Sequence, residues 1–346
     1  MTSLSEKPTS QYRTLHPMFP ALRGKEHRWL VTGAAGFIGS HLVEALLSMG
    51  QRVTALDDLS VGRRRNLDLA VEAAGPDSGA RLRFIEGSIT DPERCLEAAE
   101  GADFVLHHAA LASVPGSIEA PDRFSLVNAG GFVNVLEAAR KGGARRVVYA
   151  SSSAVYGDAQ RLPQIEAETG ACLSPYALTK AVNELYANLW TRLYHVDCIG
   201  LRYFNVFGAR QDPEGAYAAV IPRWIDAVRK GESPVLYGDG TATRDFCPVS
   251  NVVLANLLAA LTDAPDAAGG VFNVACGKSV TLNELLSLIA VNFAPDRTVQ
   301  PVHEPEREGD IHRSAASIER AARILGYRPL QFLEDGLKAL AAQASD

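Results

Sequence analysis

The chain has 346 residues, 47% of them hydrophobic, and a formal net charge of −6 at pH 7. A chain of this length and composition can bury a large core, so we expect a folded globular protein. Its acidic balance, with a pI near 5.8, lacks the clustered basic surface that attracts nucleic acids and anionic membranes. We therefore expect no nucleic-acid partner and no membrane partner.

The cysteines and the N-terminal residues indicate in which cellular compartment the protein is located. No C-x-x-C pair suggests a zinc or redox site, and an odd set of widely spaced cysteines is typical of a reducing environment. Residues 1–27 are polar and interrupted by prolines, without the apolar stretch of a signal peptide, and no later run reaches the ~18 apolar residues of a membrane span. We expect a cytoplasmic protein without a metal, beginning with an N-terminal extension over residues 1–27. The cysteines are Cys95, Cys172, Cys198, Cys247 and Cys276.

Short apolar runs alternate with segments of helix length along most of the chain. Continuous apolar strands separated by helices predict an α/β fold with a doubly wound parallel sheet of the Rossmann type. The small-residue stretch Ala70–Ala80 is expected to be a surface excursion. The predicted strands are Trp29–Thr32, Val53–Leu56, Leu82–Ile85, Phe104–Leu106, Arg146–Ala150, Asp197–Leu201 and Gly270–Val274.

The alternation loosens after about residue 205, where glycines and prolines interrupt it. We expect an NAD-binding domain over residues 28–205, with later segments returning to it. Residues 206–346 are expected to form mainly a smaller, mixed α/β lobe that binds the substrate. Ligands of such folds bind beyond the carboxyl ends of the strands.

A glycine-rich turn follows the first predicted strand and begins the first predicted helix. Three glycines within residues 33–39 have the spacing G-x-x-G-x-x-G, which lets backbone N–H groups approach a pyrophosphate. A lone glycine motif is often only a strand–helix turn, but here an aspartate ends the second strand, where it would bind ribose hydroxyls and repel a 2′-phosphate. The glycine turn and this aspartate together predict that the cofactor is NAD rather than NADP. The cofactor residues predicted here are Gly33, Gly36, Phe37, Ile38, Gly39 and Asp57.

Ser152, Tyr176 and Lys180 are the candidate catalytic residues. Ser152 lies in a serine triplet at the end of the fifth strand, and Tyr176 and Lys180 lie four apart on a helix that Ser174 and Pro175 begin. The Lys180 ammonium would favour the phenolate of Tyr176, which could take a hydroxyl proton as hydride leaves the substrate. Such a pair alone is usually an ordinary helix face. After the glycine turn and the acidic residue, it predicts a dehydrogenase-type site.

This combination, over residues 28–327, resembles the extended short-chain dehydrogenase/reductase family, and within it the NAD-dependent nucleotide-sugar epimerases. The sequence is most similar to the bacterial UDP-N-acetylglucosamine 4-epimerases of O-antigen synthesis. The resemblance implies an isomerase of polysaccharide biosynthesis that keeps its NAD bound and acts on a UDP-sugar. It continues at the C-terminal segments 201–208, 219–222, 238–240, 243–246 and 307–310.

The resemblance also implies roles for further residues. Ser88 stands where many relatives have an aspartate that contacts adenine, and Ile89 would pack on the ring. Arg244 and Arg307 would bind the diphosphate of the substrate by forked hydrogen bonds. The cofactor residues added in this way are Ser88, Ile89, Tyr176, Lys180 and Tyr203. The implied substrate residues are Ser113, Ser152, Ser153, Asn205, Val220, Arg244, Arg307, Asp310 and Ser314.

The residues around Ser153 favour epimerisation over dehydration. Related sugar dehydratases carry an acidic pair there to expel a hydroxyl, whereas Ser153 and Ala154 offer a hydroxyl and a methyl. An epimerase needs no such pair, because the bound cofactor takes hydride from C4 and returns it to the opposite face. Related galactose epimerases have a bulky residue at the Ser314 position, so serine leaves room for an N-acetyl group. The resemblance thus favours interconversion of UDP-GlcNAc and UDP-GalNAc.

Other functions stay open at this point. A UDP-glucuronate or UDP-galacturonate 4-epimerase would need a cation near C6; no basic residue is plainly assigned to that role, and Arg210 and Arg313 stay open for it. A UDP-glucose 4-epimerase would use the same cleft. A non-catalytic NAD-binding scaffold would not require Ser152, Tyr176 and Lys180 together. Family analogy suggests a homodimer formed by helices near 127–139 and 176–193, although small residues there are equally consistent with internal packing.

Overall fold

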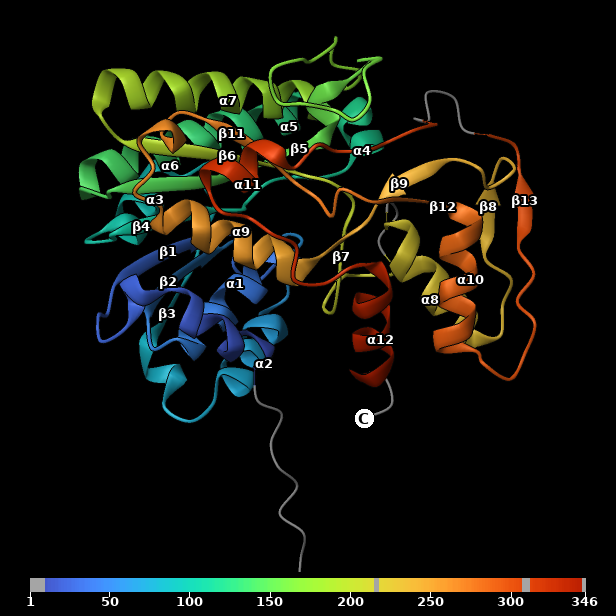
Figure 1. Cartoon of the computed structure of the whole chain (residues 1–346). Helices are drawn as coiled ribbons and strands as arrows, with labels where there is room; N and C mark the ends of the chain where they lie inside the picture. The colour runs from blue at the N-terminus through green and yellow to red at the C-terminus, as the bar shows by residue number, and fades with distance from the viewer. Residues whose placement is uncertain (1–9, 215–217, 307–311, 344–346) are drawn as a thin grey trace, which may run out of the picture. The chain divides into compact units, whose positions relative to one another are not determined.

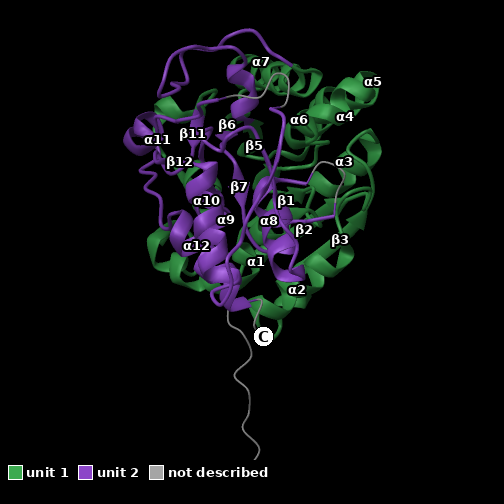
Figure 2. Ribbon diagram, turned by 90° about the vertical axis from the view of Figure 1, so that its right-hand side faces the viewer, with its two compact units in different colours: residues 1–151, 174–201, 253–271 green, residues 152–173, 202–252, 272–346 purple. Residues whose placement is uncertain are grey.

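A computed structural model describes residues 10–214, 218–306 and 312–343 of the chain. The chain forms two compact units, shown in different colours in Figure 2. Unit 1 comprises residues 1–151, 174–201 and 253–271, and unit 2 comprises residues 152–173, 202–252 and 272–346. Three strands, β5 (Arg146–Ser152), β6 (Asp197–Tyr203) and β11 (Val271–Val274), contribute residues to both units.

A seven-stranded sheet runs through the fold in the order β11-β6-β5-β4-β1-β2-β3 (Figure 1). β1 pairs in parallel with β2 and with β4, so the strand order reverses between β1 and β4. The order β3-β2-β1-β4-β5-β6 is that of doubly wound dinucleotide-binding sheets. The predicted fold class and all seven predicted strands are confirmed. The strands not yet given are β1 (Arg28–Thr32), β2 (Arg52–Asp57), β3 (Leu82–Glu86) and β4 (Phe104–His107).

Helices cover the sheet. Its strands are buried, which explains why they are continuous apolar runs in the sequence. All four residues of β4 are buried, as a strand covered on both faces requires. Phe132 and Leu136 of α6 belong to one core cluster with Val105 and Val147 of the sheet. The α-helices within unit 1 are α1 (Phe37–Ser48), α2 (Arg64–Ala74), α3 (Pro92–Ala99), α4 (Val114–Glu119), α5 (Pro121–Phe124), α6 (Gly131–Gly142) and α7 (Pro175–Tyr194). The same unit contains the 3-10 helices η1 (Gln11–Met18), η2 (Pro20–Leu22), η3 (Ser78–Arg81) and η6 (Pro265–Ala267), and the π-helix η4 (Ser125–Gly130).

The expectation of a surface excursion over residues 70–80 is wrong in its first part. Helix α2 continues to Ala74, and both Ala70 and Ala74 are buried. Small side chains permit close packing of α2, which the composition alone does not distinguish from a loop. The chain leaves the helix at the C-cap residue Gly75, which has a φ of +101°.

Unit 2 has its own core, built mainly by three helices. Helix α8 (Val220–Lys230) buries Ile221, Trp224 and Val228, which lie on one helical face. These side chains cluster with residues of α10 (Leu282–Phe293) and α12 (Leu333–Gln343). The remaining elements are η5 (Ser153–Tyr156), α11 (Glu319–Ile324) and the short strands β7 (Val206–Phe207), β8 (Val235–Tyr237), β9 (Thr243–Asp245), β10 (Cys247–Pro248), β12 (Ser279–Thr281) and β13 (Val302–Glu304), while α9 (Val249–Leu261) has residues in both units.

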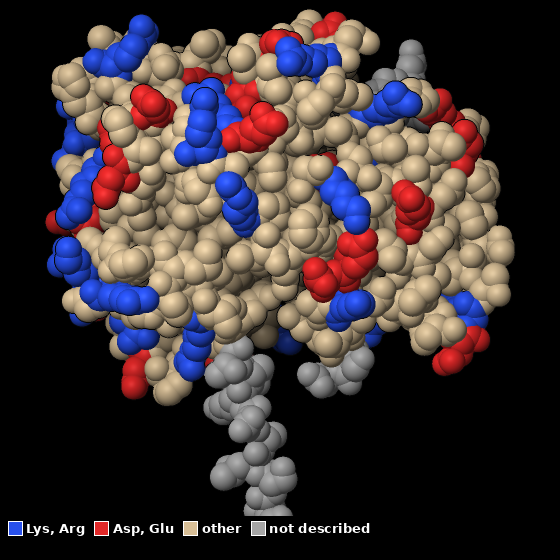
Figure 3. Space-filling view, viewed as in Figure 1, with Lys and Arg blue, Asp and Glu red and all other residues tan. Residues whose placement is uncertain are grey.

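Charged side chains of both signs are interspersed on the face of the molecule in Figure 3, without a broad region of one sign. Among the residues that the structure describes, no helix is both long and apolar enough to cross a membrane. In the same residues, no group of three or more His, Cys, Asp or Glu side chains is arranged to hold a metal ion.

Candidate active site

The turn between β1 and α1 needs glycine at two positions. Gly33 has a φ of +65°, and a Cβ on it would lie 2.6 Å from the backbone nitrogen of Ala109. A Cβ on Gly39 would collide with the carbonyl oxygen of Gly33. The turn is therefore closed against side chains at both points, as expected where a helix packs tightly on a strand and the backbone must approach a ligand.

The N-terminus of α1 has the features of an anion site. Gly36 is the N-cap residue, and no side chain caps the helix there. Phe37 and Ile38 begin the helix, and no acidic residue lies in its first turn. The first N–H groups of a helix lack partners within the helix and carry partial positive charge, so they fit a pyrophosphate. This is an independent sign that the turn fits the phosphates of a dinucleotide.

Asp57 lies at the end of β2, beside this turn. Its two carboxylate oxygens accept hydrogen bonds from the N–H groups of Ala35 and Leu59, each at 2.9 Å. Burial raises the pKa of the Asp57 carboxyl, while these N–H bonds oppose the rise. A carboxylate has about four acceptor positions, so ribose hydroxyls can use those that the backbone N–H groups leave open. Asp57 thus holds the turn and retains the capacity predicted for a ribose ligand.

Ser88 and Ile89 follow β3. The Ser88 hydroxyl accepts a hydrogen bond from the Thr90 hydroxyl at 2.9 Å, which fixes the local turn. Ile89 is buried, and its side chain lies so close to α6 that a Cβ on Gly131 would be 2.6 Å from its Cδ1. The Asn134 amide donates to the Ile89 carbonyl at 3.0 Å. Ile89 is therefore held against α6 by side-chain packing and by a hydrogen bond.

Tyr176 and Lys180 lie on α7, where the sequence predicted them. Ser174 caps the helix by accepting a hydrogen bond from the Ala177 N–H at 3.1 Å. The Lys180 Nζ atom lies 5.9 Å from the centre of the Tyr176 ring and donates to the carbonyl oxygen of Ala150 at 2.9 Å. Burial lowers the pKa of Lys180 from 10.5 to about 8. Around neutral pH Lys180 is thus charged and close to the phenol.

Two histidines near Lys180 were not predicted as part of the site. Burial and, to a lesser degree, the Lys180 charge hold the pKa of His107 well below its usual value. The same effects lower the pKa of His108 to about 3. The Nδ1 atom of His107 is 2.8 Å from the Thr32 hydroxyl. Both rings are therefore neutral at physiological pH and add no positive charge beside the lysine. The only signal in the sequence was two polar residues at the end of an apolar strand.

Asn128 was also missed. It lies in η4 and is buried. Its amide accepts from the Leu111 N–H at 2.8 Å, donates to the Leu111 carbonyl at 2.9 Å, and donates to the Thr179 hydroxyl at 3.1 Å. Thr179 directly precedes Lys180, so Asn128 links the chain after β4 to α7. A π-helical turn, often found at functional sites, places this side chain inward, and no local pattern predicts such a turn.

The predicted serines and Tyr203 occupy strand and helix ends. Ser113 caps α4 by accepting from the Gly116 N–H at 2.9 Å. Ser152 ends β5, and its hydroxyl accepts from the Ala154 N–H at 3.1 Å, while Ser153 begins η5. Tyr203 ends β6 and is buried. Carboxyl ends of the central strands thus carry several of the predicted side chains, where ligands of this fold class bind.

Three predicted substrate residues line one cavity within unit 2. Asn205, Val220 and Arg244 border a space of about 150 Å³, a volume that can hold a single six-membered ring. Aromatic and aliphatic side chains form much of its wall, and a second arginine joins Arg244. Sequence reasoning did not identify these additional residues, because they come from separate elements. The lining residues are Asn205, Ala218, Val220, Arg223, Trp224, Val235, Tyr237, Arg244, Phe246 and Leu282.

Ser314 is held beside the strand that carries Arg244. Its N–H donates to the Thr243 carbonyl at 3.1 Å, and its carbonyl accepts from the Ser279 hydroxyl at 2.7 Å. The side chain is buried, with 7% of the residue exposed. Arg307 and Asp310, both predicted substrate residues, lie outside the described residues.

Comparison with known proteins agrees with this geometry. The model of the NAD dependent epimerase/dehydratase family matches residues 29–275. A UDP-glucose 4-epimerase of Mycolicibacterium smegmatis is 39% identical over 313 residues, which cover 90% of this chain and 96% of that protein.

Two solved structures are similar over nearly the whole chain. A UDP-N-acetylglucosamine 4-epimerase from Methanobrevibacter ruminantium, in complex with UDP-N-acetylmuramic acid, has a TM-score of 0.84 and 38% identity, covering 93% of this chain and 99% of that one. A UDP-glucose 4-epimerase of Thermus thermophilus, in complex with NAD, has a TM-score of 0.77 and 34% identity, covering 91% and 98%.

Proposed function

The chain belongs to the NAD-dependent epimerase/dehydratase family, and from this membership we propose that it interconverts UDP-GlcNAc and UDP-GalNAc. As an NAD-dependent nucleotide-sugar epimerase, it inverts C4 of a UDP-sugar. The proposal concerns which sugar it prefers and which residues act on it. The observation that carries the proposal is Ser314, a small buried residue hydrogen-bonded to the strand of Arg244.

The residues around the β1–α1 turn fit NAD. Gly33, Gly36 and Gly39 would let the pyrophosphate approach the N-terminus of α1, and Asp57 would accept hydrogen bonds from the adenosine ribose. NAD supplies a carbon centre that accepts hydride from C4 and returns it. The acidic Asp57 disfavours a 2′-phosphate, so NAD rather than NADP is expected.

Tyr176 would move the proton of the C4 hydroxyl. Its phenolate accepts that proton when the C4–H bond breaks, and the resulting phenol returns it when the bond forms again on the other face. The ammonium of Lys180, 5.9 Å from the Tyr176 ring centre, favours the phenolate. Ser152 would hydrogen-bond the same substrate oxygen and orient it. His107 and His108, both neutral, leave Lys180 as the cation of this cluster.

The cavity in unit 2 would take the pyrimidine ring of a uridine diphosphate. Tyr237 and Phe246 offer apolar walls to a pyrimidine ring, and Arg244 and Arg223 offer cations to phosphate. Asn205 has a φ of +30° and donates to the Asp245 carbonyl at 3.1 Å, so its position is well defined. Ser113, Ser153 and Val220 are further substrate contacts in this proposal, as are the undescribed Arg307 and Asp310.

A hexuronate substrate is the second candidate. Arg210, one of the two cations considered for a C6 carboxylate, lines a different cavity, formed by α8 with Phe293 and Leu340. Arg313 precedes Ser314, and its backbone forms an isolated β-bridge with Thr243. The geometry therefore leaves Arg313 as the better candidate for that reaction, and Arg313→Met would test it.

The decisive experiment is a substrate comparison. Purified protein would be incubated separately with UDP-GlcNAc, UDP-glucose and UDP-glucuronate, and ¹H NMR would follow the change at C4. We expect UDP-GalNAc from UDP-GlcNAc with the highest kcat/KM of the three. A higher kcat/KM for UDP-glucose or UDP-glucuronate would replace the substrate assignment, and no conversion of any of them would contradict the activity.

An exposed apolar stripe on α7 supports the proposed homodimer. Leu178, Leu185 and Leu193 are 55%, 72% and 58% exposed and are spaced seven and eight residues apart, which places them along one side of the helix. A second copy presenting the same helix would bury this stripe in an isologous interface. Leu185→Glu should then lower the mass measured by light scattering from that of a dimer to that of a monomer. An unchanged mass in the variant would contradict the α7 interface.

A further inference from the structure

The N-terminal segment 10–22 precedes the residues that the family model matches, yet it is packed into unit 1. It forms η1 and η2, and its apolar side chains Tyr12, Leu15, Phe19 and Leu22 are all buried. A segment that served only as a tether would leave such side chains exposed. The burial shows that these residues are part of the domain.

Two polar contacts join this segment to α1. The Tyr12 hydroxyl lies 2.8 Å from the Nδ1 atom of His41, and the Ser10 hydroxyl donates to a carboxylate oxygen of Glu44 at 2.7 Å. His41 and Glu44 are three residues apart, so they lie on one face of α1, and both are buried. Buried polar groups that lose their partners are costly, so α1 is adapted to the presence of the segment.

The same segment is anchored on α2. The backbone N–H of Ser10 donates to the Ala73 carbonyl at 2.9 Å, and the guanidinium of Arg13 donates to the Ala74 carbonyl at 3.0 Å. The last carbonyls of a helix lack partners within it, so both bonds satisfy orphan acceptors. Residues 10–13 therefore connect the end of α2 to the middle of α1.

The contact with α1 leads directly to the phosphate-binding turn. His41 is one helical turn after Phe37, and the two rings meet edge to face with centroids 5.8 Å apart. The Tyr12 ring also meets the His41 ring edge to face, with centroids 5.9 Å apart. Phe37 follows Gly36, the N-cap residue that no side chain caps. Two edge-to-face ring contacts thus connect Tyr12, through His41, to the first residue of α1.

We infer that residues 10–22 form a brace that controls how tightly the protein retains NAD. Tyr12 and Ser10 are positioning residues: they act through His41 and Glu44 on the orientation of α1 and touch neither cofactor nor substrate. Loss of their hydrogen bonds would let α1 shift along α2, and the N–H groups at its start would lose their alignment toward the pyrophosphate. The inference rests on the NAD site of the proposed function and is independent of the sugar.

The test compares variants of the full chain. Tyr12→Phe keeps the ring and removes the hydroxyl, Ser10→Ala removes the bond to Glu44, and Ser10→Thr keeps a hydroxyl. Thr14→Ala is the matched control, because the Thr14 hydroxyl is exposed and donates to the Gln11 carbonyl within η1. The readouts are NAD(H) per chain after gel filtration, the NADH release rate by fluorescence, Tm, and kcat with saturating NAD.

The double variant Tyr12→Phe, Ser10→Ala is expected to release NADH about tenfold faster and to retain less NAD, with kcat recovered when NAD is saturating. Ser10→Thr should restore retention relative to Ser10→Ala, and Thr14→Ala should behave like the parent. A double variant with a lower Tm but an unchanged release rate would overturn the inference, because the segment would then only add stability. NADH release is measured without substrate, so failure of the epimerase assignment would not affect this result.

Discussion

The ammonium of Lys180 donates a hydrogen bond to the carbonyl oxygen of Ala150, 2.9 Å away, from a position only 3% exposed. A charge in such a place stabilises a neighbouring phenolate more than it would in water. The same burial lowers the pKa of Lys180 to about 8, so the charged lysine destabilises the folded state. If Lys180 acts on Tyr176 as proposed, the burial that strengthens its charge also lowers the stability of the folded protein.

The effect of Lys180→Met on the free energy of unfolding should consequently depend on pH. The folded-state pKa lies below the unfolded value of 10.5, so the stability of the parent protein rises as the pH rises from about 8 to 10.5. Methionine does not titrate. The free energy of unfolding of the variant, relative to that of the parent, should therefore be highest below pH 8 and should fall by about 3 kcal/mol between pH 8 and 10.5. Denaturant unfolding of both proteins across this pH range measures it, and a difference independent of pH would contradict the assignment.

Tyr176→Phe should remove the proton acceptor and lower turnover by at least ~10²-fold, while NAD stays bound. Tyr186→Phe is a suitable control, because Tyr186 lies on the same helix and is 37% exposed. Turnover of both variants would be measured with the preferred UDP-sugar, and NAD content after denaturation. Near-normal turnover of Tyr176→Phe would exclude Tyr176 from the chemistry.

Gly39→Ala should disrupt the phosphate-binding turn. The new Cβ would meet the carbonyl oxygen of Gly33, which is backbone and cannot move without displacing the turn. We expect a loss of bound NAD and a destabilisation of about 1–3 kcal/mol. Gly130→Ala adds the same atom in η4, where the nearest neighbour is 4.0 Å away, and should leave NAD content unchanged. Equal NAD content in the two variants would contradict this account of the turn.

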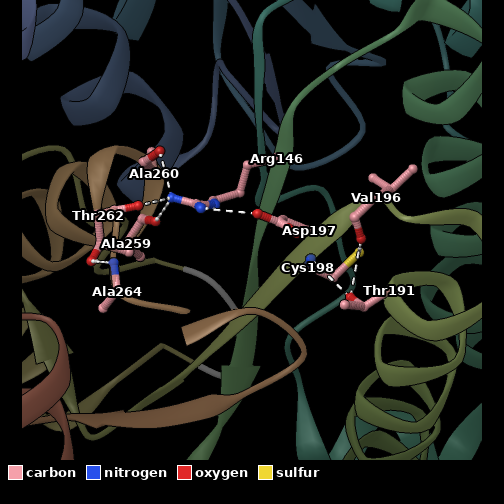
Figure 4. A network of polar contacts seen from close by, with 9 residues as sticks. All are labelled: Arg146, Thr191, Val196, Asp197, Cys198, Ala259, Ala260, Thr262 and Ala264. Carbon is pink, nitrogen blue, oxygen red and sulfur yellow. Dashed lines mark hydrogen bonds and ion pairs between the residues drawn. The ribbon is translucent and has the colours of Figure 1, made fainter. Parts of the chain in front are cut away.

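Arg146 joins three segments of unit 1, as Figure 4 shows. One guanidinium nitrogen donates to the carbonyls of residues 259, 260 and 262, and the other pairs with Asp197 at 3.0 Å. Arg146→Met should lower the free energy of unfolding by about 2–3 kcal/mol, because buried acceptors lose a charged donor. Arg145→Met removes an exposed arginine that pairs with Asp103 at 3.4 Å and should cost no more than about 1 kcal/mol. Similar losses in both variants would show that the Arg146 contacts contribute little.

Ser314→Tyr should test the sugar pocket. A phenol ring in place of the small side chain would overpack the site, a change that typically costs about 1–3 kcal/mol, or up to about two orders of magnitude in relative preference. The kcat/KM for UDP-GlcNAc should fall relative to that for UDP-glucose, which lacks the acetamido group. Ser314→Ala keeps the space and should keep the ratio. Equal loss with both sugars would indicate damage to the fold, and an unchanged ratio would remove Ser314 from the pocket.

The local patterns of the chain were sufficient for its strands, its glycine turn and the start of α7. Continuous apolar runs predict buried parallel strands, and Ser174 with Pro175 predicts a helix start, since both signals depend only on neighbouring residues. The family resemblance then assigned roles to positions such as Asn205 and Arg244, which the structure places around one cavity.

Tertiary structure alone decided what depends on contacts between distant segments. The inward position of Asn128 requires a π-helical turn, and the neutral state of His108 requires burial near Lys180. The packing of Tyr12 against His41 joins residues 29 positions apart, and neither residue carries a local signal for the other. Burial and hydrogen bonding across such separations arise only when elements pack, so composition, periodicity and spacing could not predict them.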